Sequence, residues 1–317
     1  AKRAAEKATG IPMANMLMSA THNHSAPAAM ELALNTPDAH YPKLLREKLA
    51  EAVIEAHRRL EPAKVGVAAL DEPSEVFCRR WKVRDGKVPP DPFGRTTDRV
   101  RMNPGPLGGD LLEPAGPIDP QLSIVAAQAL DGRPIALFAT YSLHYVGGVP
   151  AGSFSADYFA EFANQVKQRL KGNDRFTAAM ANGTSGDINN QDYRKAPVKG
   201  EKRPEPMQRC REVASKLADR AAQAYGSMKL GADVKLAVVE RTLTVKNRLP
   251  SAEDVAWATR MLGPLNNATV NKVATIPGVY AYETLKMAEP TFPKTAELKL
   301  QAIRIGDAAI ATVPNEA

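Results

Sequence analysis

Long apolar runs, cysteines and aromatic residues are all scarce in this sequence of 317 residues. No apolar run approaches the roughly 18 residues that a membrane-spanning helix requires, so we expect no such helix here. Cysteine occurs only as Cys78 and Cys210, too few for a disulfide framework and wrongly spaced for a cysteine metal site. At this length the chain can bury a full core without cross-links.

The charge of the chain is positive but not concentrated in one motif. The formal net charge is +7, and hydrophobic residues at 44% with charged residues at 24% are ordinary for a globular protein. This charge permits attraction to phosphates or anionic lipid surfaces without demonstrating either. Residues 193–206 (YRKAPVKGEKRPEP) are rich in Lys, Arg and Pro, with no aromatic stacking residue among the charges. We therefore expect a solvated loop there and no nucleic-acid partner.

The two ends of the sequence resemble interior parts of a fold. The first residues, AKRAAEKATGIP, are typical of the last turns of an amphipathic helix, and the last residues, AIATVPNEA, follow a strand into a turn. Neither an initiator Met nor a signal peptide is visible. We interpret the chain as a single domain over residues 1–317, truncated at both ends.

Hydrophobic periodicity predicts alternating helices and strands. Helices are expected over 41–62, 157–170, 206–227 and 251–262, the last with Ser251 as its N-cap. Strands are expected over 14–21, 64–70, 176–181 and 234–245, as two closing strands within 297–314, and as a hairpin over 121–142 around Asp131-Gly132. Residues 78–117 appear irregular, which in a compact domain is typical of a functional or mobile segment. The predicted fold class is α/β, with mixed β-sheets and flanking helices.

Two histidines stand two residues apart where the first predicted strand ends. In an extended segment His22 and His24 project to the same side, so both can face one cavity. They could bind zinc together, or one could bind zinc while the other contacts substrate. The HxH pattern is short and common in loops, so the pair needs partners before it indicates a metal site.

Further polar residues follow other predicted strands. His144 comes just past the strand of ALFATYSLHYVGG, and Glu316 just past the last strand. Two histidines and a carboxylate are a common zinc set. The turn over 179–192 (AMANGTSGDINNQD) could stabilise an oxyanion or be an ordinary turn. Asp157 could be a site residue or a helix cap. His40 and His57 are expected to be surface residues.

These segments together resemble the neutral/alkaline non-lysosomal ceramidase family, particularly its divergent bacterial members. The family's LSATHTHSGP strand and turn is similar to GIPMANMLMSATHNHSAP, and its N-R and NP segments resemble FCRRW and MNPG. Its hairpin ending in a metal histidine resembles GPIDPQLSIVAAQALDGRPIALFATYSLHY, and its serine–aspartate helix start resembles SADY. Its GDVSPN turn is similar to NGTSGDINN, and its strand ending in GE to RIGDAAIATVPNEA. The segments occur in order over essentially the whole chain.

The resemblance implies a neutral-ceramidase-like catalytic domain that uses Zn²⁺ to hydrolyse an N-acyl bond of a lipid or acyl-amide substrate. Carried over, the metal ligands would be His22, His144 and Glu316, with His24 as the neighbouring substrate or water contact. A tyrosine ligand of the family would lie beyond Ala317. The active-site arginine would be Arg79, with Arg80 as the alternative. The family also implies a role in sphingolipid metabolism, a secreted or periplasmic location and contact with a membrane surface.

The turn NGTSGDINN departs from the family's GDVSPN turn at a position that matters for the chemistry. Asp187 matches the family's aspartate, but Asn189 stands where the family has its proposed serine nucleophile. An amide cannot attack a carbonyl or be activated as a hydroxyl is. Thr184 or Ser185 could substitute, or a zinc-activated water could attack while Arg79 and the turn amides stabilise the oxyanion.

Three hypotheses follow. The first is a zinc-dependent amidohydrolase of a ceramide-like bond, and a close variant hydrolyses another amide or an ester. The third is an exported lipid- or carbohydrate-binding protein whose catalytic site has decayed.

Overall fold

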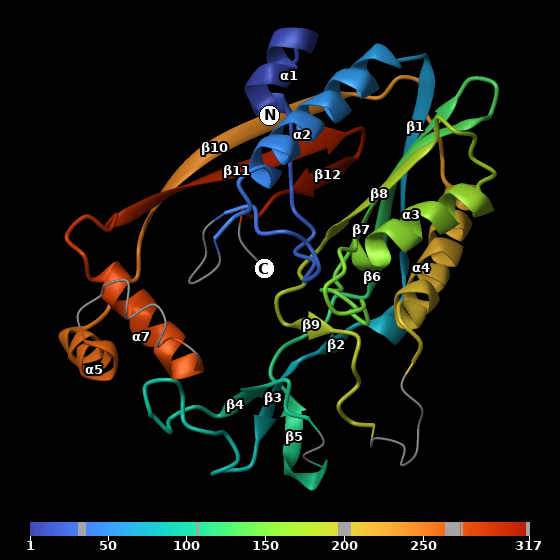
Figure 1. Ribbon diagram of the computed structural model, residues 1–317. Helices are drawn as coiled ribbons and strands as arrows, with labels where there is room; N and C mark the ends of the chain where they lie inside the picture. The colour runs from blue at the N-terminus through green and yellow to red at the C-terminus, as the bar shows by residue number, and fades with distance from the viewer. Residues whose placement is uncertain (31–35, 106–107, 196–203, 264–272, 274, 315–317) are drawn as a thin grey trace.

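The main sheet of the protein has four strands in the order β1-β6-β7-β8 (Figure 1). The structure is a computed structural model that describes residues 1–30, 36–105, 108–195, 204–263, 273 and 275–314. The strands are β1 (Ala63–Asp71), β6 (Gln121–Ala129), β7 (Pro134–Tyr141) and β8 (Thr177–Asn182). β6 is antiparallel to both its neighbours, whereas β7 and β8 run parallel. The α/β class with a mixed sheet is therefore confirmed.

Two helices cover one face of the main sheet (Figure 1). They are α3 (Asp157–Arg169) and α4 (Gln208–Ser227). Buried residues of α4 recur at helical spacing, and those of β6 alternate as Leu122, Ile124 and Ala126, so both elements turn an apolar side to the same core. The hairpin between β6 and β7 turns where the sequence predicts it, and Gly132 has the positive φ, 89°, that glycine adopts without steric cost.

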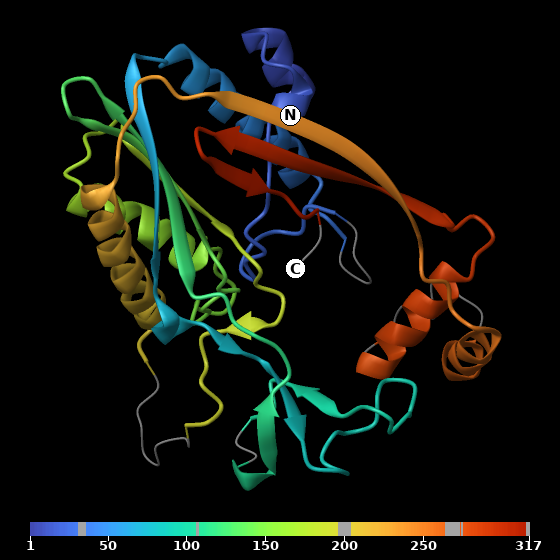
Figure 2. The same cartoon turned by 180° about the vertical axis from the view of Figure 1, so that it is seen from behind.

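A second sheet, in the order β10-β11-β12, forms a long ribbon beside the first. Its strands are β10 (Leu236–Lys246), β11 (Thr295–Ile305) and β12 (Ala308–Ala311). Seen from behind, β10 runs from the main sheet to a pair of helices, α5 (Ala252–Leu262) and α7 (Ile276–Met287) (Figure 2). Ser251 caps α5 as predicted, in a capping box with Asp254. Helix α7 was not predicted from the sequence.

Residues 78–117 are less irregular than the sequence suggests. They contain β3 (Arg80–Val83), β4 (Val100–Met102) and β5 (Leu111–Pro114), which form a small sheet in the order β4-β3-β5. A separate pair joins β2 (Phe77–Cys78) to β9 (Ile188–Asn189). The prediction of an irregular segment was wrong because these strands are short and separated by Pro- and Gly-rich turns, so no periodicity shows in the sequence.

The predicted strand over 14–21 does not form. After α1 (Lys2–Thr9), the chain makes a short 3-10 turn, Met13–Asn15, and residues 16–30 join no sheet. Helix α2 (Tyr41–Arg58) follows further along the chain. The side-chain amide of Gln301 in β11 donates to the carbonyl oxygens of Ala14 at 2.8 Å and Met16 at 3.3 Å. The segment thus takes side-chain hydrogen bonds in place of the ladder that a strand needs.

Among the described residues, the structure contains no helix that is long and apolar enough to cross a membrane.

Candidate metal centre

Three histidines from two distant segments meet at one point of the structure. The ring nitrogens of His22, His24 and His144 that could bind a metal all lie within 4.8 Å of one another. Nε2 of His24 lies 3.2 Å from Nε2 of His22, and the ring centroids of His22 and His144 are 4.7 Å apart. The fold thus brings the predicted pair to the histidine that follows the hairpin.

His144 reaches this point just beyond the end of β7, and its side chain is 2% exposed. Its Nδ1 lies 3.1 Å from the carbonyl oxygen of Ser185. Because a carbonyl oxygen only accepts, Nδ1 carries the proton in this contact and Nε2 keeps its lone pair. A hydrogen bond of this kind fixes the tautomer and the orientation of a metal-binding imidazole.

The segment that follows His144 is held by the carboxylate of Asp157, the first residue of α3. Its two oxygens accept hydrogen bonds from the backbone amides of Val146 at 2.9 Å and Gly147 at 2.8 Å. Its Oδ1 also accepts a hydrogen bond from the backbone amide of Tyr158, the second residue of α3, at 2.7 Å. The Asp157 side chain therefore ties the start of α3 to the loop beside His144.

The loop that carries His22 and His24 is tied to the same region. The side-chain amide of Asn23 donates to the carbonyl oxygen of Ser155 at 3.0 Å, and the amide of Ser155 donates to the carbonyl oxygen of Ser25 at 2.9 Å. These bonds join the residue between the two histidines and the residue after them to the segment before α3. The approach of the two segments therefore depends on backbone hydrogen bonds as well as on the histidine rings.

Backbone strain collects around this site. His22, Asn103 and Asp157 have φ values of 51°, 48° and 54°, in the left-handed region. Such a conformation costs of order 1–3 kcal/mol for a residue other than glycine and is often found at functional sites. Asparagine, aspartate and histidine adopt this region more often than most other residues do, so each of the three positions carries a residue type that tolerates it.

The imidazole set fits zinc. Two nitrogens bound to one tetrahedral zinc at about 2.0–2.1 Å are about 3.3 Å apart, close to the 3.2 Å between His22 and His24. His24, predicted as a substrate or water contact, therefore lies as near to His22 as a second ligand would. Glu316, the predicted carboxylate ligand, lies outside the described residues.

Arg79, the predicted active-site arginine, is held by the turn over 179–192. Its backbone amide donates to the carbonyl oxygen of Asp187 at 2.7 Å, and its guanidinium Nη2 donates to the carbonyl oxygen of Gly186. Its own carbonyl oxygen accepts from the amide of Asn103 at 2.7 Å. Arg80 instead forms an exposed ion pair with Asp187 at 3.4 Å. Of the two arginines, Arg79 is the one with a fixed position.

Asn189 points its side chain at two other polar residues. Its Nδ2 donates to the hydroxyl oxygen of Tyr193 at 2.8 Å and to Oδ1 of Asn103 at 3.0 Å, while its Oδ1 accepts from the amide of Gln191 at 3.0 Å. The Tyr193 hydroxyl in turn donates to Oδ1 of Asn103 at 2.8 Å. The predicted catalytic position thus belongs to a closed hydrogen-bond network.

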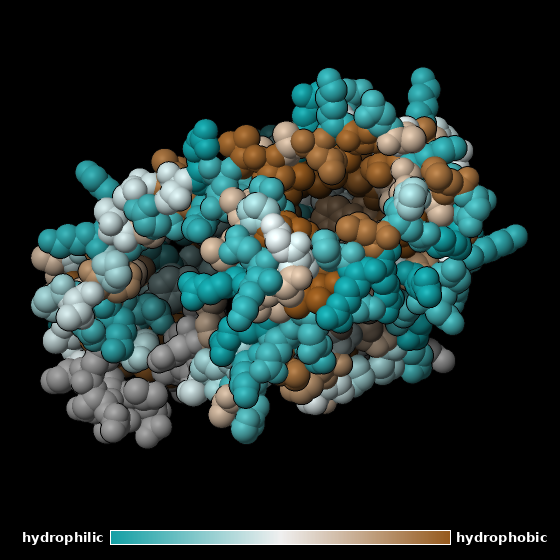
Figure 3. All heavy atoms as spheres, turned by 90° about the horizontal axis from the view of Figure 1, so that it is seen from above, coloured by the Kyte–Doolittle hydropathy of each residue, from teal (hydrophilic) through white to brown (hydrophobic). Residues whose placement is uncertain are grey.

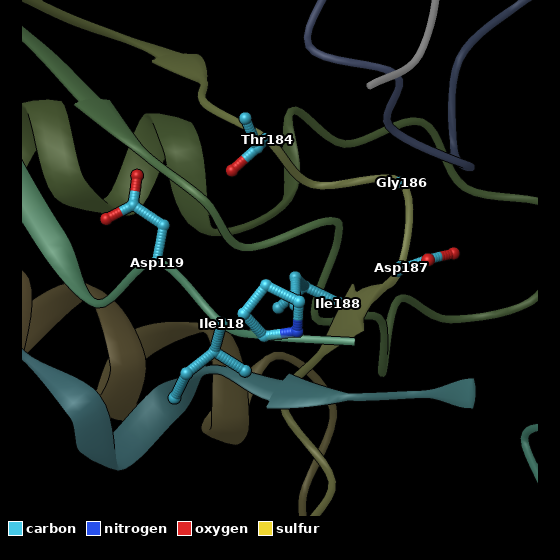
Figure 4. Close-up of a pocket in the computed structure, with 7 residues that line it drawn as sticks. Ile118, Asp119, Thr184, Gly186, Asp187 and Ile188 are labelled. Atoms are coloured by element: carbon cyan, nitrogen blue, oxygen red, sulfur yellow. The ribbon is translucent and has the colours of Figure 1, made fainter. Parts of the chain in front are cut away.

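A pocket of about 560 Å³ is lined by the same turn (Figure 4). Its polar residues include Asp119 and Thr184, which lie at one end, and Asp187, which lies at the other (Figure 4). The buried hydroxyl of Ser142 lies 3.3 Å from the Asp119 carboxylate and 3.2 Å from the Thr184 hydroxyl. Because the neighbouring Ser185 contacts His144, this one turn contributes both to the pocket and to the histidine site.

Two tyrosines near these residues were missed by the sequence interpretation. The ring of Tyr145 stacks on that of His24, with centroids 3.8 Å apart. Burial raises the pKa of the Tyr193 phenol, the Asn189 hydrogen bond and the Arg79 charge lower it, and Tyr145 raises it slightly. Tyr145 could have been suspected because it follows a candidate ligand directly. Nothing in the spacing of Tyr193 indicates a site, since its partners are brought to it by the fold.

The sequence matches no protein-family model and none of the curated proteins. Among solved structures, the fold is similar to that of the neutral ceramidase from Pseudomonas aeruginosa, with a TM-score of 0.51 and 15% sequence identity. The match covers 84% of this chain and 42% of that one. A second structure, of a ceramidase complexed with C2, has a TM-score of 0.49 and 14% identity, over 84% of this chain and 44% of that one.

The chain therefore spans less than half the length of the ceramidases that it matches. At this identity the likeness concerns the fold alone. The structure thus has a ceramidase-like fold in which three histidines converge beyond the end of a strand of the main sheet.

Proposed function

We propose that this chain is the metal-binding part of a zinc-dependent hydrolase that cleaves an N-acyl amide bond of a ceramide-like lipid. The observation that carries the proposal is the convergence of His22, His24 and His144, whose candidate ligand nitrogens lie within 4.8 Å of one another. The ceramidase-like fold supports the choice of reaction class, and the substrate remains part of the proposal.

Each residue of the candidate site would have a separate role in this reaction. The three imidazoles would hold zinc, which at such a centre supplies Lewis acidity and an acidified water. The carbonyl oxygen of Ser185 keeps the Nε2 lone pair of His144 available by holding the proton on Nδ1. Arg79, fixed by Gly186 and Asp187, would offer positive charge to the oxygen of the acyl group as negative charge develops on it.

Asn189 supports a route in which no side chain attacks the carbonyl. Its amide has no nucleophilic oxygen or sulfur, and both its Nδ2 and its Oδ1 are engaged with neighbouring residues. The Thr184 hydroxyl, a sequence-based substitute, contacts Ser142 on the pocket side of the turn. Water is therefore the nucleophile that we propose.

A test of zinc binding separates the histidines of the site from the others. His22→Ala and His144→Ala are each expected to lower zinc affinity by more than the roughly 10–100-fold that loss of an outer-sphere partner costs. His40→Ala and His57→Ala are matched controls and should bind zinc as the parent chain does, since neither belongs to the histidine cluster. Zinc can be measured by competition with a chromophoric chelator. Retention of zinc by both site variants would overturn the proposal.

A substrate panel decides between the two hydrolase hypotheses. The zinc-loaded protein is offered ceramides, short N-acyl amides and esters of matched chain length, and release of the carboxylic acid is measured. Hydrolysis of ceramides that chelation abolishes supports the first hypothesis, and a preference for short amides or esters supports its variant. The protein tested should include whatever sequence flanks this chain.

The internal hydrogen bonds of Asn189 also favour a second candidate, a lipid- or carbohydrate-binding protein that has lost catalysis. Zinc-free protein that binds such a ligand and hydrolyses nothing on the panel would establish it. A secreted or periplasmic location and contact with a membrane surface stay part of the proposal.

A further inference from the structure

Three polar residues from two distant segments form a hydrogen-bonded triangle next to Arg79. Asn103 follows β4, Asn189 ends β9, and Tyr193 lies four residues further along the chain. All three sides are between 2.8 and 3.0 Å long, measured between Oδ1 of Asn103, Nδ2 of Asn189 and the hydroxyl oxygen of Tyr193. The directions of donation leave one arrangement: the hydroxyl accepts from Asn189 and donates to Asn103.

The ring of Tyr193 is set firmly while its hydroxyl faces polar groups. The side chain is 8% exposed and packs in a small apolar cluster with Trp81 and Val83 of β3. The backbone amide of Asn103 donates to the carbonyl oxygen of Arg79 at 2.7 Å, which places the triangle beside this arginine. Asn189 shares the turn over 179–192 with Ser185, whose carbonyl oxygen contacts His144, so one turn joins the triangle to the histidine cluster.

Three backbone amides of the turn already have partners inside the protein. Gly183 donates to the carbonyl oxygen of Tyr141 at 3.0 Å, Thr184 to the hydroxyl of Ser142 at 3.1 Å, and Ile188 to the carbonyl oxygen of Ser185 at 3.0 Å. At these three positions a hydrogen-bond donor to a developing negative charge has to be a side chain.

We propose that the Tyr193 hydroxyl, oriented by Asn189 and Asn103, donates a hydrogen bond to the acyl oxygen of the substrate beside Arg79. This assignment rests on the proposed hydrolase function. When water adds to the acyl carbon, the carbonyl electron pair moves to the acyl oxygen, and Tyr193 turns its O–H from Asn103 to that oxygen. The phenol keeps its proton throughout. The C–N bond then breaks, the amine leaves with a proton from the attacking water, and the acid product keeps the same hydrogen bond.

A phenol is suited to this position for two physical reasons. Burial raises the pKa of Tyr193, so the hydroxyl stays protonated and remains a donor at neutral pH. The amide of Asn189 donates to the phenol oxygen and so polarises its O–H bond. Asn189 thus acts as a positioning residue for Tyr193, which accounts for an amide at a place where a nucleophile is not needed.

The test removes the hydroxyl and leaves the ring. Tyr193→Phe is expected to lower kcat about 10²-fold, near the loss seen when one oxyanion donor is removed, with KM, zinc affinity and melting temperature close to those of the parent chain. Tyr225→Phe is the matched control, because its hydroxyl also accepts from a side-chain amide, that of Gln128 at 3.1 Å, but between β6 and α4. It should leave kcat unchanged.

A second readout does not depend on activity. The carboxylate of hexanoate, which resembles the acid product, is titrated into zinc-free protein by calorimetry. Tyr193→Phe should weaken its binding about 10-fold or more, as expected for a hydrogen bond to a charged group. Asn103→Gly keeps the positive φ of Asn103 accessible while removing the competing acceptor, so it should bind hexanoate at least as tightly as the parent chain.

The outcomes separate this assignment from the proposed function. If the panel shows no hydrolysis but Tyr193→Phe weakens hexanoate binding, the hydrolase proposal fails and the donor assignment stands. If hydrolysis is zinc-dependent and Tyr193→Phe changes neither kcat nor hexanoate affinity, the donor assignment is overturned alone. Equal losses of hexanoate affinity in Tyr193→Phe and Asn103→Gly would show a purely structural triangle and would also overturn it.

Discussion

The two larger sheets of this protein differ in how well they are buried. Residues of the main sheet and of α3 and α4 form a continuous core, whereas the helices beside the β10-β11-β12 ribbon share only a small cluster around Ala258 and Ala281. Several apolar residues of the ribbon stay exposed, among them Leu236, Val239 and Leu243. Seen from above, hydrophobic side chains gather around a hollow in the surface (Figure 3).

The candidate site draws its rigid parts from the better-packed region. His144 and Ser185 follow β7 and β8, and Asp157 begins a helix that packs on the same core. In the described part of the chain, the ribbon approaches the histidine pair through Gln301, which holds the segment after α1. Packed cores permit few alternative side-chain positions, so ligands attached to them keep their geometry. Among the described residues, the main sheet thus positions His144, while the ribbon holds the segment that leads to His22 and His24.

The largest expected effect contrasts a leucine from each sheet. Leu137 of β7 is 1% exposed and Leu243 of β10 is 49% exposed. Leu137→Ala should lower the free energy of unfolding by about 2–5 kcal/mol, because it leaves a cavity in a packed core, and Leu243→Ala by less than about 1 kcal/mol. Urea unfolding followed by circular dichroism measures both. Equal losses of unfolding free energy would show that the two sheets are equally well packed at these positions.

The next largest effect concerns the loop beside His144. Asp157→Asn places an amide N–H group against the amides of Val146 and Gly147 and should cost about 1.5–3 kcal/mol of unfolding free energy. Zinc affinity should also fall about 10-fold, because the neighbouring ligand loses its fixed position. Asp174→Asn, in an exposed pair with Lys167, is the control for loss of an aspartate charge. Unchanged zinc affinity in Asp157→Asn would show that the loop does not position His144.

Alkaline pH is expected to weaken the main core through Cys210. Burial, and then the adjacent Asp157 carboxylate, raise the pKa of this thiol from 9.0 to about 12. Because the unfolded chain loses this proton at lower pH than the folded chain, the free energy of unfolding should fall as pH rises from about 9 to about 12. The slope from this group approaches about 1.4 kcal/mol per pH unit.

The measurement is urea unfolding at pH 8, 10 and 11 for the parent chain and Cys210→Ser. The serine variant should lose less free energy of unfolding over this range, while Cys78→Ser serves as the control at the other buried cysteine. Parallel curves for the parent and Cys210→Ser would contradict the prediction.

The smallest expected effect lies at the helical pair beside the ribbon. Arg95 pairs with Asp254 of α5, and Phe93 packs on Trp257 with ring centroids 4.7 Å apart. Because both charged side chains are partly exposed, Arg95→Ala should cost no more than about 1 kcal/mol. Thermal unfolding, with Arg99→Ala in a more exposed pair as the control, measures it. A loss as large as that of Leu137→Ala would show that this contact carries more of the fold than its exposure suggests.

The main sheet and its helices could be predicted because their signals are local. The β6–β7 hairpin shows its turn residues, and α4 shows its apolar spacing within single stretches of sequence. The strand predicted over 14–21 failed because an apolar run does not show whether a partner strand is present; here Gln301, nearly 300 positions away, takes that role. The small sheet around Trp81 was missed for the opposite reason, since its strands are too short to show a period.

The candidate site, like the fold, was predictable from the sequence only in part. By itself, the sequence determined which side chains stand at strand ends, among them His22, His24 and His144, and that Asn189 carries no nucleophile. Only the tertiary structure decided that the three imidazoles meet within 4.8 Å, and that Asn189 faces Tyr193 and Asn103. The physical reason is that residue type and local spacing fix what a side chain can donate or accept, whereas packing between distant segments fixes its partner.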